Sequence, residues 1–189
     1  MSGASPRAVR LDLATFGMVA AAATLLVARI WLPALGFTGR VIGIAAILLA
    51  ILVGSLLVPV SHARACLHPA TVLIVGLAAI ALALAAGGRP VRAPYIAWAL
   101  PLSLLAAVAE EAMFRRAAYG ALERHGPAVA IGATALGFAL IHVPLYGVAV
   151  FPVDLGAGLL LSWQRWASGT WSVPAATHAA ANAVSTVMR

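Results

Sequence analysis

The sequence has little charge of either sign and no lysine at all. Of its 189 residues 9% are charged, with five acidic side chains against twelve basic ones, all of them arginine. Soluble globular domains average about 25% charged residues, so the composition excludes an ordinary soluble domain. A hydrophobic content of 63% and a mean hydropathy of +1.04 exclude a disordered chain and indicate an integral membrane protein. The missing lysine, beside abundant alanine, is typical of a composition bias of the genome and favours a prokaryotic inner or plasma membrane.

Cysteine and clustered positive charge are also scarce. The single cysteine, Cys66, allows no internal disulfide, and we expect it to be a small buried apolar residue. The net charge is +7, but the arginines are scattered between long apolar runs. Nucleic-acid binding needs a clustered basic face, so we expect no nucleic-acid partner. The first partner that this composition indicates is the lipid bilayer.

Long uncharged runs fill most of the chain. A membrane-spanning helix needs about 20 mostly apolar residues, and the uncharged runs are 13–28, 41–63, 65–88, 93–109, 125–153 and 166–188. We expect the first to continue to about residue 32, with Arg29 extending its side chain toward the membrane surface. The run from 125 predicts a helix over 127–148, followed by a short helix over 152–166. The sequence therefore predicts an all-α, polytopic, multi-pass transmembrane helix bundle of six to seven helices, in a single membrane domain over 1–189.

The arginines favour one orientation of this bundle. With the N-terminus inside, more arginines lie on the cytoplasmic side than outside, as the positive-inside rule requires. The inside group is Arg7, Arg10, Arg64, Arg116, Arg124 and Arg165, and the outside group is Arg40, Arg89, Arg92 and Arg189.

Two of the acidic residues stand side by side, Glu110 and Glu111, directly after the uncharged run 93–109. Ionisable groups within membrane helices are costly and usually face a cavity or a partner, so they are candidates for function. On a helix Glu111 and Arg115 lie four apart on one face, in the favourable acid-first order, whereas Glu110 is rotated by about 100° from Glu111. This division predicts one glutamate held as structure and one free for proton transfer. The alternative is a helix end at the interface, with these charges among lipid headgroups.

Two other apolar runs carry polar residues at the same helical spacing. Phe138 and His142 lie four apart in the run 125–153, and His178 and Asn182 lie four apart in the last run. A single histidine of this kind is usually a hydrogen-bonded core residue. Three helices that each deliver polar groups into an apolar bundle are expected to converge, because each alone would leave unsatisfied polar groups in hydrocarbon.

In this order, the motifs Glu110-Glu111-x-x-x-Arg115, Phe138-x-x-x-His142 and His178-x-x-x-Asn182 resemble the signature of the CPBP family, also called the Abi family. That family comprises CAAX-protease-like and bacteriocin-processing intramembrane proteases, and it includes the type II CAAX prenyl endopeptidases. The resemblance covers about residues 93–188. It implies a catalytic core with a polar cavity over 93–188 and accessory N-terminal helices over 1–92.

The resemblance also implies a role for each motif residue, in a glutamic-type mechanism. Glu110 with His142 would polarise the attacking water, and the glutamate would later pass the proton to the leaving amine. His178 and the amide of Asn182 would stabilise the tetrahedral oxyanion. The supporting residues that would brace the helix, orient Glu110 and pack beside His142 are Glu111, Arg115 and Phe138.

A metal-dependent reaction is the alternative to this metal-free mechanism. Glu110, His142 and His178 have the composition of a His₂Glu zinc site with an open position. Asn182 is a poor zinc ligand, however, and the sequence contains no His-Glu-x-x-His motif. We therefore expect no cofactor, with a divalent metal such as zinc as the alternative.

The sequence thus predicts an integral-membrane endopeptidase. Its expected substrate is a membrane-presented peptide or protein: a C-terminal sorting tail, a lipidated tail or a leader peptide. Paired-aspartate chemistry is excluded, because Asp12 precedes the first run and the other aspartate, Asp154, is expected to cap a helix. Two other functions remain open. One is a non-proteolytic membrane scaffold or immunity protein of the same fold, and the other is a small proton-coupled transporter that uses Glu110 and His142 as a relay.

Overall fold

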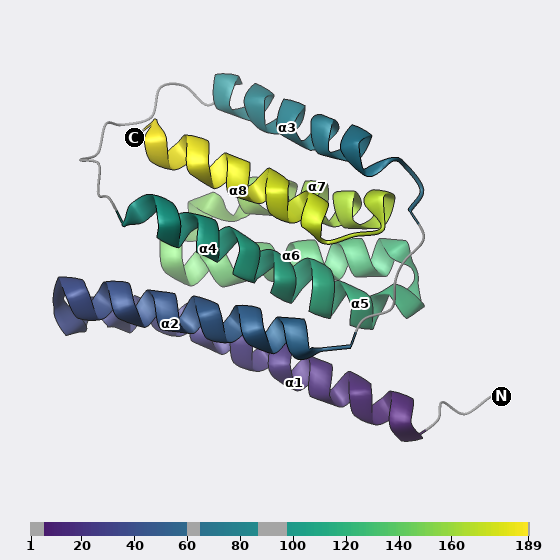
Figure 1. The fold of residues 1–189 in the computed structure, drawn as a ribbon, viewed down its shortest axis with the longest axis horizontal. Coiled ribbons are helices and arrows are strands. Elements are labelled where there is room, and N and C mark those ends of the chain that lie inside the picture. Colours follow the sequence, from purple (N-terminus) through teal and green to yellow (C-terminus); the bar gives the residue numbers. More distant parts are fainter. Residues whose placement is uncertain (1–5, 60–64, 87–97, 189) are drawn as a thin grey trace.

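The computed structural model describes residues 6–59, 65–86 and 98–188, which are almost entirely helical and include no strand. The all-α bundle predicted from the sequence is therefore confirmed. Figure 1 shows the arrangement of its α-helices, which are α1 (Pro6–Ala28), α2 (Gly36–Leu57), α3 (Pro69–Ala86), α4 (Ala99–Glu111), α5 (Tyr119–Leu122), α6 (Pro127–Tyr146), α7 (Phe151–Ser168) and α8 (Ser172–Val187). Short segments of tighter or wider helix join some of them: η1 (Arg29–Leu35), η2 (Ala112–Ala118), η3 (Glu123–His125) and η4 (Val148–Val150).

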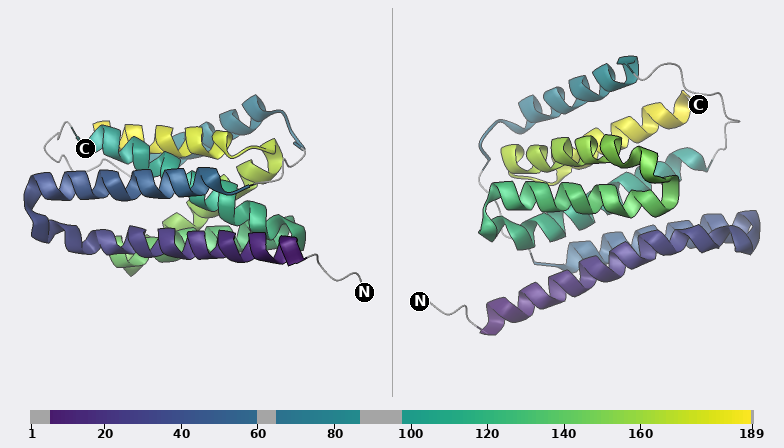
Figure 2. Two further views of the ribbon diagram at one scale, coloured as in Figure 1. Left: turned by 60° about the horizontal axis from the view of Figure 1, so that its bottom comes forward. Right: turned by 180° about the vertical axis from the view of Figure 1, so that it is seen from behind.

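Three helical stretches in the described residues are long and apolar enough to cross a membrane: Leu13–Leu57, α3 and α6. The first is 45 residues long, about twice the length that one span needs. It folds back at η1, a 3₁₀ turn that contains Pro33. Gly36 follows with a φ of 70°, a conformation that favours glycine. As a result α1 and α2 form an antiparallel hairpin along one side of the bundle (Figure 1 and Figure 2).

The hairpin is tied to the rest of the bundle at the end of α2. The last carbonyl groups of a helix have no partner within it. Here the Arg116 guanidinium, on η2, donates from Nη1 to the carbonyl oxygens of Ser55 and Val58. We call α4 with η2 the motif helix, because it carries the motif from Glu110 to Arg115. An arginine of the motif helix therefore caps α2.

Helices α6 and α7 approach each other closely because small residues face each other. A Cβ atom added to Gly158 would lie 2.9 Å from the carbonyl oxygen of Ala135. Nearby, the Thr134 and Ser162 hydroxyls are 2.9 Å apart and hydrogen bonded. Small residues at such contacts are typical of helix packing in membranes. Helix α7 is also longer than the predicted 152–166 and ends at Gly169, which has a left-handed backbone.

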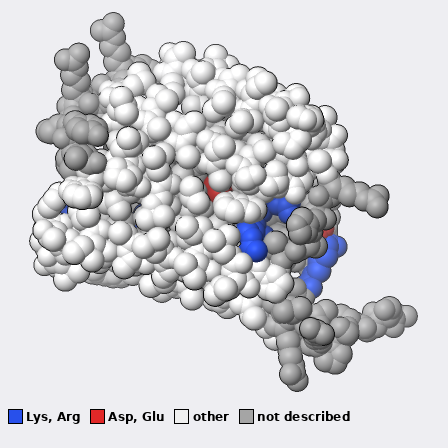
Figure 3. Space-filling model, viewed as in Figure 1, with Lys and Arg blue, Asp and Glu red and all other residues white. Residues whose placement is uncertain are grey.

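Four described arginines outside the site, Arg40, Arg116, Arg124 and Arg165, lie toward two opposite ends of the bundle. α5, the end of α2 and the end of α7 lie at one end, whereas the start of α2 lies at the other (Figure 1). Arg116, Arg124 and Arg165 thus belong to the first end and Arg40 to the second, which are the relative sides predicted from the sequence. Basic atoms also gather near the α5 end of a face that is otherwise almost uncharged (Figure 3). Four arginines in that prediction lie outside the described residues: Arg64, Arg89, Arg92 and Arg189.

The prediction for Cys66 is wrong, because this residue is exposed. It lies in the connection before α3 rather than in a helix. Its backbone N–H and that of Leu67 each donate to the carbonyl oxygen of Ala167, at 2.9 Å. The connection is therefore held to the end of α7 by its backbone, which leaves the thiol outside the core.

We predict that Gly158→Ala destabilises the protein. The added methyl group meets the backbone of Ala135, so α6 and α7 have to separate, at a cost of about 1–3 kcal/mol. The unfolding midpoint in detergent, followed by circular dichroism, should fall. Gly156→Ala is the matched control, since a Cβ there meets nothing within 4 Å. Equal midpoints for the two variants would contradict the close packing.

Candidate active site

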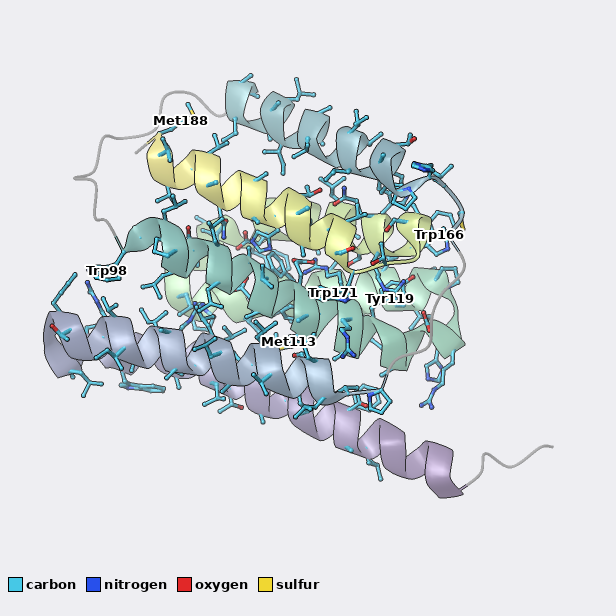
Figure 4. The ribbon with its side chains drawn as sticks, viewed as in Figure 1. Trp98, Met113, Tyr119, Trp166, Trp171 and Met188 are labelled. Carbon is cyan, nitrogen blue, oxygen red and sulfur yellow. The ribbon has the colours of Figure 1, made fainter. Side chains whose placement is uncertain are left out.

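The side chains of the predicted motifs meet in the interior of the bundle. Glu110 and Glu111 are the last two residues of α4, and their exposed fractions are 4% and 0%. Figure 4 shows nitrogen and oxygen atoms of side chains gathered between α4 and α8, within otherwise apolar surroundings. The predicted convergence is therefore present, and the headgroup interpretation of the two glutamates does not agree with their burial.

Glu111 is the centre of one charged group. Its Oε1 atom accepts hydrogen bonds from Arg115 Nη1 and from His178 Nδ1, both at 2.9 Å. The pairing of Glu111 with Arg115 expected from their spacing is thus observed, and His178 joins it from α8. Because a carboxylate can only accept, His178 carries a proton on Nδ1. Glu111 therefore orients one of the two motif histidines.

Arg115 is fully buried and fixes this group to its surroundings. Its Nη2 atom donates to the carbonyl oxygen of Gly158 on α7, at 3.1 Å. The guanidinium carbon also lies 4.7 Å from the centre of the Phe138 ring, which is a favourable cation–π distance. Within the described part of the chain, Arg115 Nε and Glu111 Oε2 have no hydrogen-bond partner. One arginine thereby joins α4, α6 and α7 at the site.

Glu110 belongs to a second group with His142. Its Oε2 atom lies 3.7 Å from His142 Nε2, which is longer than a hydrogen bond. His142 Nδ1 is 2.7 Å from the carbonyl oxygen of Phe138. A carbonyl can only accept, so Nδ1 carries the proton, and Nε2 of the neutral ring is an acceptor directed at Glu110. A water molecule placed at ordinary hydrogen-bond distance from both atoms would be held by a carboxylate and an imidazole together.

Phe138 separates the two histidines and packs against both. Its ring centre lies 4.5 Å from that of His142 and 5.7 Å from that of His178, the second contact being edge to face. Its ring also contacts Phe114 at 5.6 Å. Packing beside His142 agrees with the sequence prediction, and the contact with His178 is an additional finding.

Asn182 lies one helical turn beyond His178 and contacts a different part of α4. Its Nδ2 atom donates to the carbonyl oxygen of Ser103 at 2.9 Å. The Ser103 hydroxyl is in turn 3.2 Å from that of Thr186. These bonds hold α8 against α4, and one of the two amide hydrogens of Asn182 is used in doing so.

The helix changes its geometry directly after the two glutamates. Residues 112–118 form a π-helix, in which the Tyr119 N–H bonds to the carbonyl oxygens of Phe114 and Arg116 and bypasses that of Arg115. The Arg165 Nε atom from α7 donates to this free carbonyl at 3.0 Å. Wider turns of this kind often occur at functional sites, and here one provides a second link between the motif helix and α7.

Two charged residues near the site were assigned other roles from the sequence. Arg29 does not extend to the membrane surface: its side chain is 11% exposed, and Nη2 lies 3.8 Å from Glu110 Oε1. Asp154 does not cap α7, because Val150 occupies the cap position without a side-chain bond. Instead Asp154 lies near enough to His142, Glu110 and His178 for electrostatic interaction with them. A place of Arg29 near the site could have been predicted from its position inside an apolar run. Nothing in the motifs predicted that Asp154 would lie near the site.

The observed arrangement does not fit a metal ion. Within the described residues, no group of three His, Cys, Asp or Glu side chains is placed to hold one. Of the suggested ligands Glu110, His142 and His178, the two histidines lie beside different carboxylates: His142 is near Glu110, whereas His178 is hydrogen bonded to Glu111. We therefore derive no chemistry through a metal.

Residues 92–184 match a family model described as Rce1-like, type II CAAX prenyl endopeptidase. Over this segment, just under half of the chain, the sequence is similar to the Rce1-like family. The suspected relation to CAAX-type proteases is thus confirmed, and with the apolar helices it makes the chain a multi-pass membrane protein of a protease family. All seven motif residues lie within the Rce1-like segment, whereas Arg29 lies outside it. Searches of curated proteins and of solved structures find no match to the chain.

We predict that Arg115→Met strongly destabilises the protein. Removing one partner of a buried ion pair costs about 3–5 kcal/mol, since the other charge is left unpaired. Glu111 would keep His178 alone as its partner. The unfolding midpoint in detergent should fall far below that of Arg124→Met, which removes an exposed arginine at the end of the bundle. Similar midpoints for both variants would show that the buried pair is dispensable.

Proposed function

We propose that this protein is an intramembrane endopeptidase of the glutamic type, in which Glu110 and His142 activate a water molecule. The observation that carries the proposal is the approach of Glu110 Oε2 to His142 Nε2, at 3.7 Å, within a nearly closed apolar bundle. A base for the water and an acid for the leaving amine are the two proton-transfer roles that peptide hydrolysis requires. A glutamate that gains and returns one proton fills both roles.

The reaction follows from the placement of these groups. Water donates one hydrogen bond to Glu110 and one to the lone pair of His142 Nε2. As its oxygen attacks the peptide carbonyl carbon, Glu110 takes the proton and a C–O bond forms. The tetrahedral intermediate then breaks its C–N bond, and Glu110 gives the proton to the leaving nitrogen. The products are one carboxylic acid and one amine.

The oxyanion of that intermediate needs hydrogen-bond donors. His178 Nδ1 already donates to Glu111, so a donor at Nε2 requires the doubly protonated ring. The Glu111 carboxylate beside it offsets that positive charge. The second amide hydrogen of Asn182 is the other donor in this proposal. Glu111 and Arg115 are positioning residues, because they hold His178 and the motif helix.

The proposed substrate is a peptide bond that the membrane presents to the bundle. A C-terminal sorting tail, a lipidated tail and a leader peptide share this property. The supporting argument is the apolar surface of the described helices, which suits a bundle that lies in the bilayer where such a substrate is held.

We predict that Glu110→Gln and His142→Ala each lower hydrolysis by about 10²- to 10⁴-fold, the usual contribution of a general base. Purified protein in liposomes should be incubated with a farnesylated C-terminal peptide, a transmembrane peptide with a short C-terminal tail and a leader peptide, and products identified by mass spectrometry. His125→Ala, an exposed histidine on η3, is the control and should cleave like the wild type. Cleavage at an unaltered rate by both site variants would refute the assignment, and the absence of any wild-type cleavage would favour the scaffold.

We also predict that hydrolysis resists metal removal. Since no group of three His, Cys, Asp or Glu side chains in the described residues is placed to hold a metal ion, incubation with 1,10-phenanthroline followed by gel filtration should leave the cleavage rate unchanged. A zinc protease treated in the same buffer should lose its activity and serves as the positive control. Loss of cleavage that added Zn²⁺ restores would instead establish a metal enzyme.

A further inference from the structure

The N-terminal hairpin shares one hydrophobic core with the helix that carries the two glutamates. Leu26 of α1 and Leu48 of α2 are fully buried and lie in the same cluster as Ala109 and Met113, which flank Glu110 and Glu111. The hairpin of α1 and α2 is outside the Rce1-like segment. The environment of Glu110 is therefore built in part by residues that the family match does not include.

Arg29 extends from this hairpin to the site. It begins η1, and its Nε atom donates to the carbonyl oxygen of Leu26 at 3.1 Å. That bond holds the base of the guanidinium and leaves Nη2 at 3.8 Å from Glu110 Oε1. With 11% of its side chain exposed, Arg29 is directed inward rather than toward a lipid headgroup.

The two oxygens of Glu110 face different partners. Oε1 lies beside Arg29, at 3.8 Å, and Oε2 beside His142, at 3.7 Å. The ion pair at Oε1 favours the orientation of the carboxylate in which Oε2 faces the imidazole. Arg29 thus selects the orientation of Glu110 in which a water can be shared with His142.

Of the cations around the site, Arg29 is the one left to pair with Glu110. Arg115 and His178 also interact with Glu110, but both donate their hydrogen bonds to Glu111. An unpaired buried carboxylate costs several kcal/mol, and within the described residues Arg29 is the arginine at ion-pair distance from Glu110.

We propose that Arg29, from the N-terminal hairpin, is a positioning residue that holds the Glu110 carboxylate toward His142 and so completes the active site. This inference rests on the proposed function for its catalytic consequence. The pairing of Arg29 with Glu110 does not depend on that function and is tested separately.

The catalytic consequence is tested with Arg29→Met, Arg29→Lys and the control Arg40→Met. Arg40 lies on α2 of the same hairpin and is exposed. Misplacement of a catalytic group by about 1 Å costs about a hundredfold, so Arg29→Met should lower kcat for the best wild-type substrate by about that factor with KM little changed. Arg29→Lys keeps the charge and should recover part of kcat. A kcat for Arg29→Met equal to that of Arg40→Met, or no recovery with lysine, would overturn the proposal.

The pairing is tested by a double-mutant cycle on the unfolding midpoint, which needs no substrate. Arg29→Met should lower the midpoint by a few degrees in the wild-type background and by less in the Glu110→Gln background, where the buried carboxylate is gone. An equal effect in both backgrounds would overturn the pairing. If the wild type cleaves no substrate while the cycle shows coupling, the proposed function fails and the pairing stands.

Discussion

The pairing of buried charge is the constraint on which the rest of this structure depends. Two adjacent carboxylates, Glu110 and Glu111, are almost completely buried, and an unpaired charge in such surroundings costs several kcal/mol. Because neighbouring residues on a helix face different directions, they cannot share one cation. Glu111 is satisfied by groups on η2 and α8, and Glu110 by groups on η1 and α6. These helices pack where their charged side chains can reach Glu110 and Glu111. The pairing that stabilises the fold therefore also builds the site.

Much of this was predictable because helical spacing and hydropathy are local properties. Glu111 and Arg115, four residues apart, form the expected ion pair. Phe138 and His142 share a face for the same reason, and the cost of isolated polar groups in an apolar bundle accounts for the meeting of the motif helices. The helix from 127 was predicted to within a few residues of its end, since Gly147 leaves the helical conformation. The catalytic roles of these residues remain predictions.

The rest depends on how the helices pack, which a single sequence does not specify. Arg29 has the spacing of an arginine that reaches a lipid headgroup, and its direction is set by the fold of the hairpin around η1. Asp154 was expected to cap a helix, yet α7 begins earlier, at Phe151, so Asp154 lies within its first turn. Asn182 was predicted as a site residue because it lies one turn after His178. The part of α4 that it contacts, at Ser103, depends on how far α8 is shifted along α4. The errors for Arg29 and Asp154 concern the surroundings of each residue, whereas the role expected for Asn182 stays a prediction.

The π-helix after Glu111 lets the two halves of the motif helix take different rotations about the helix axis. A π-turn is equivalent to one residue inserted into an α-helix, which turns everything after it by about 100° relative to an unbroken ladder. Before the π-turn, the contacts of Glu110 and Glu111 fix the rotation of the helix about its axis. After it, the ring of Tyr119 lies against Arg165, with the guanidinium carbon 5.1 Å from the ring centre. A continuous α-helix would have to choose between these two alignments. Loss of one residue between 116 and 118 would therefore leave the pairing of Glu111 with Arg115 in place while it uncouples the far end of the helix from α7.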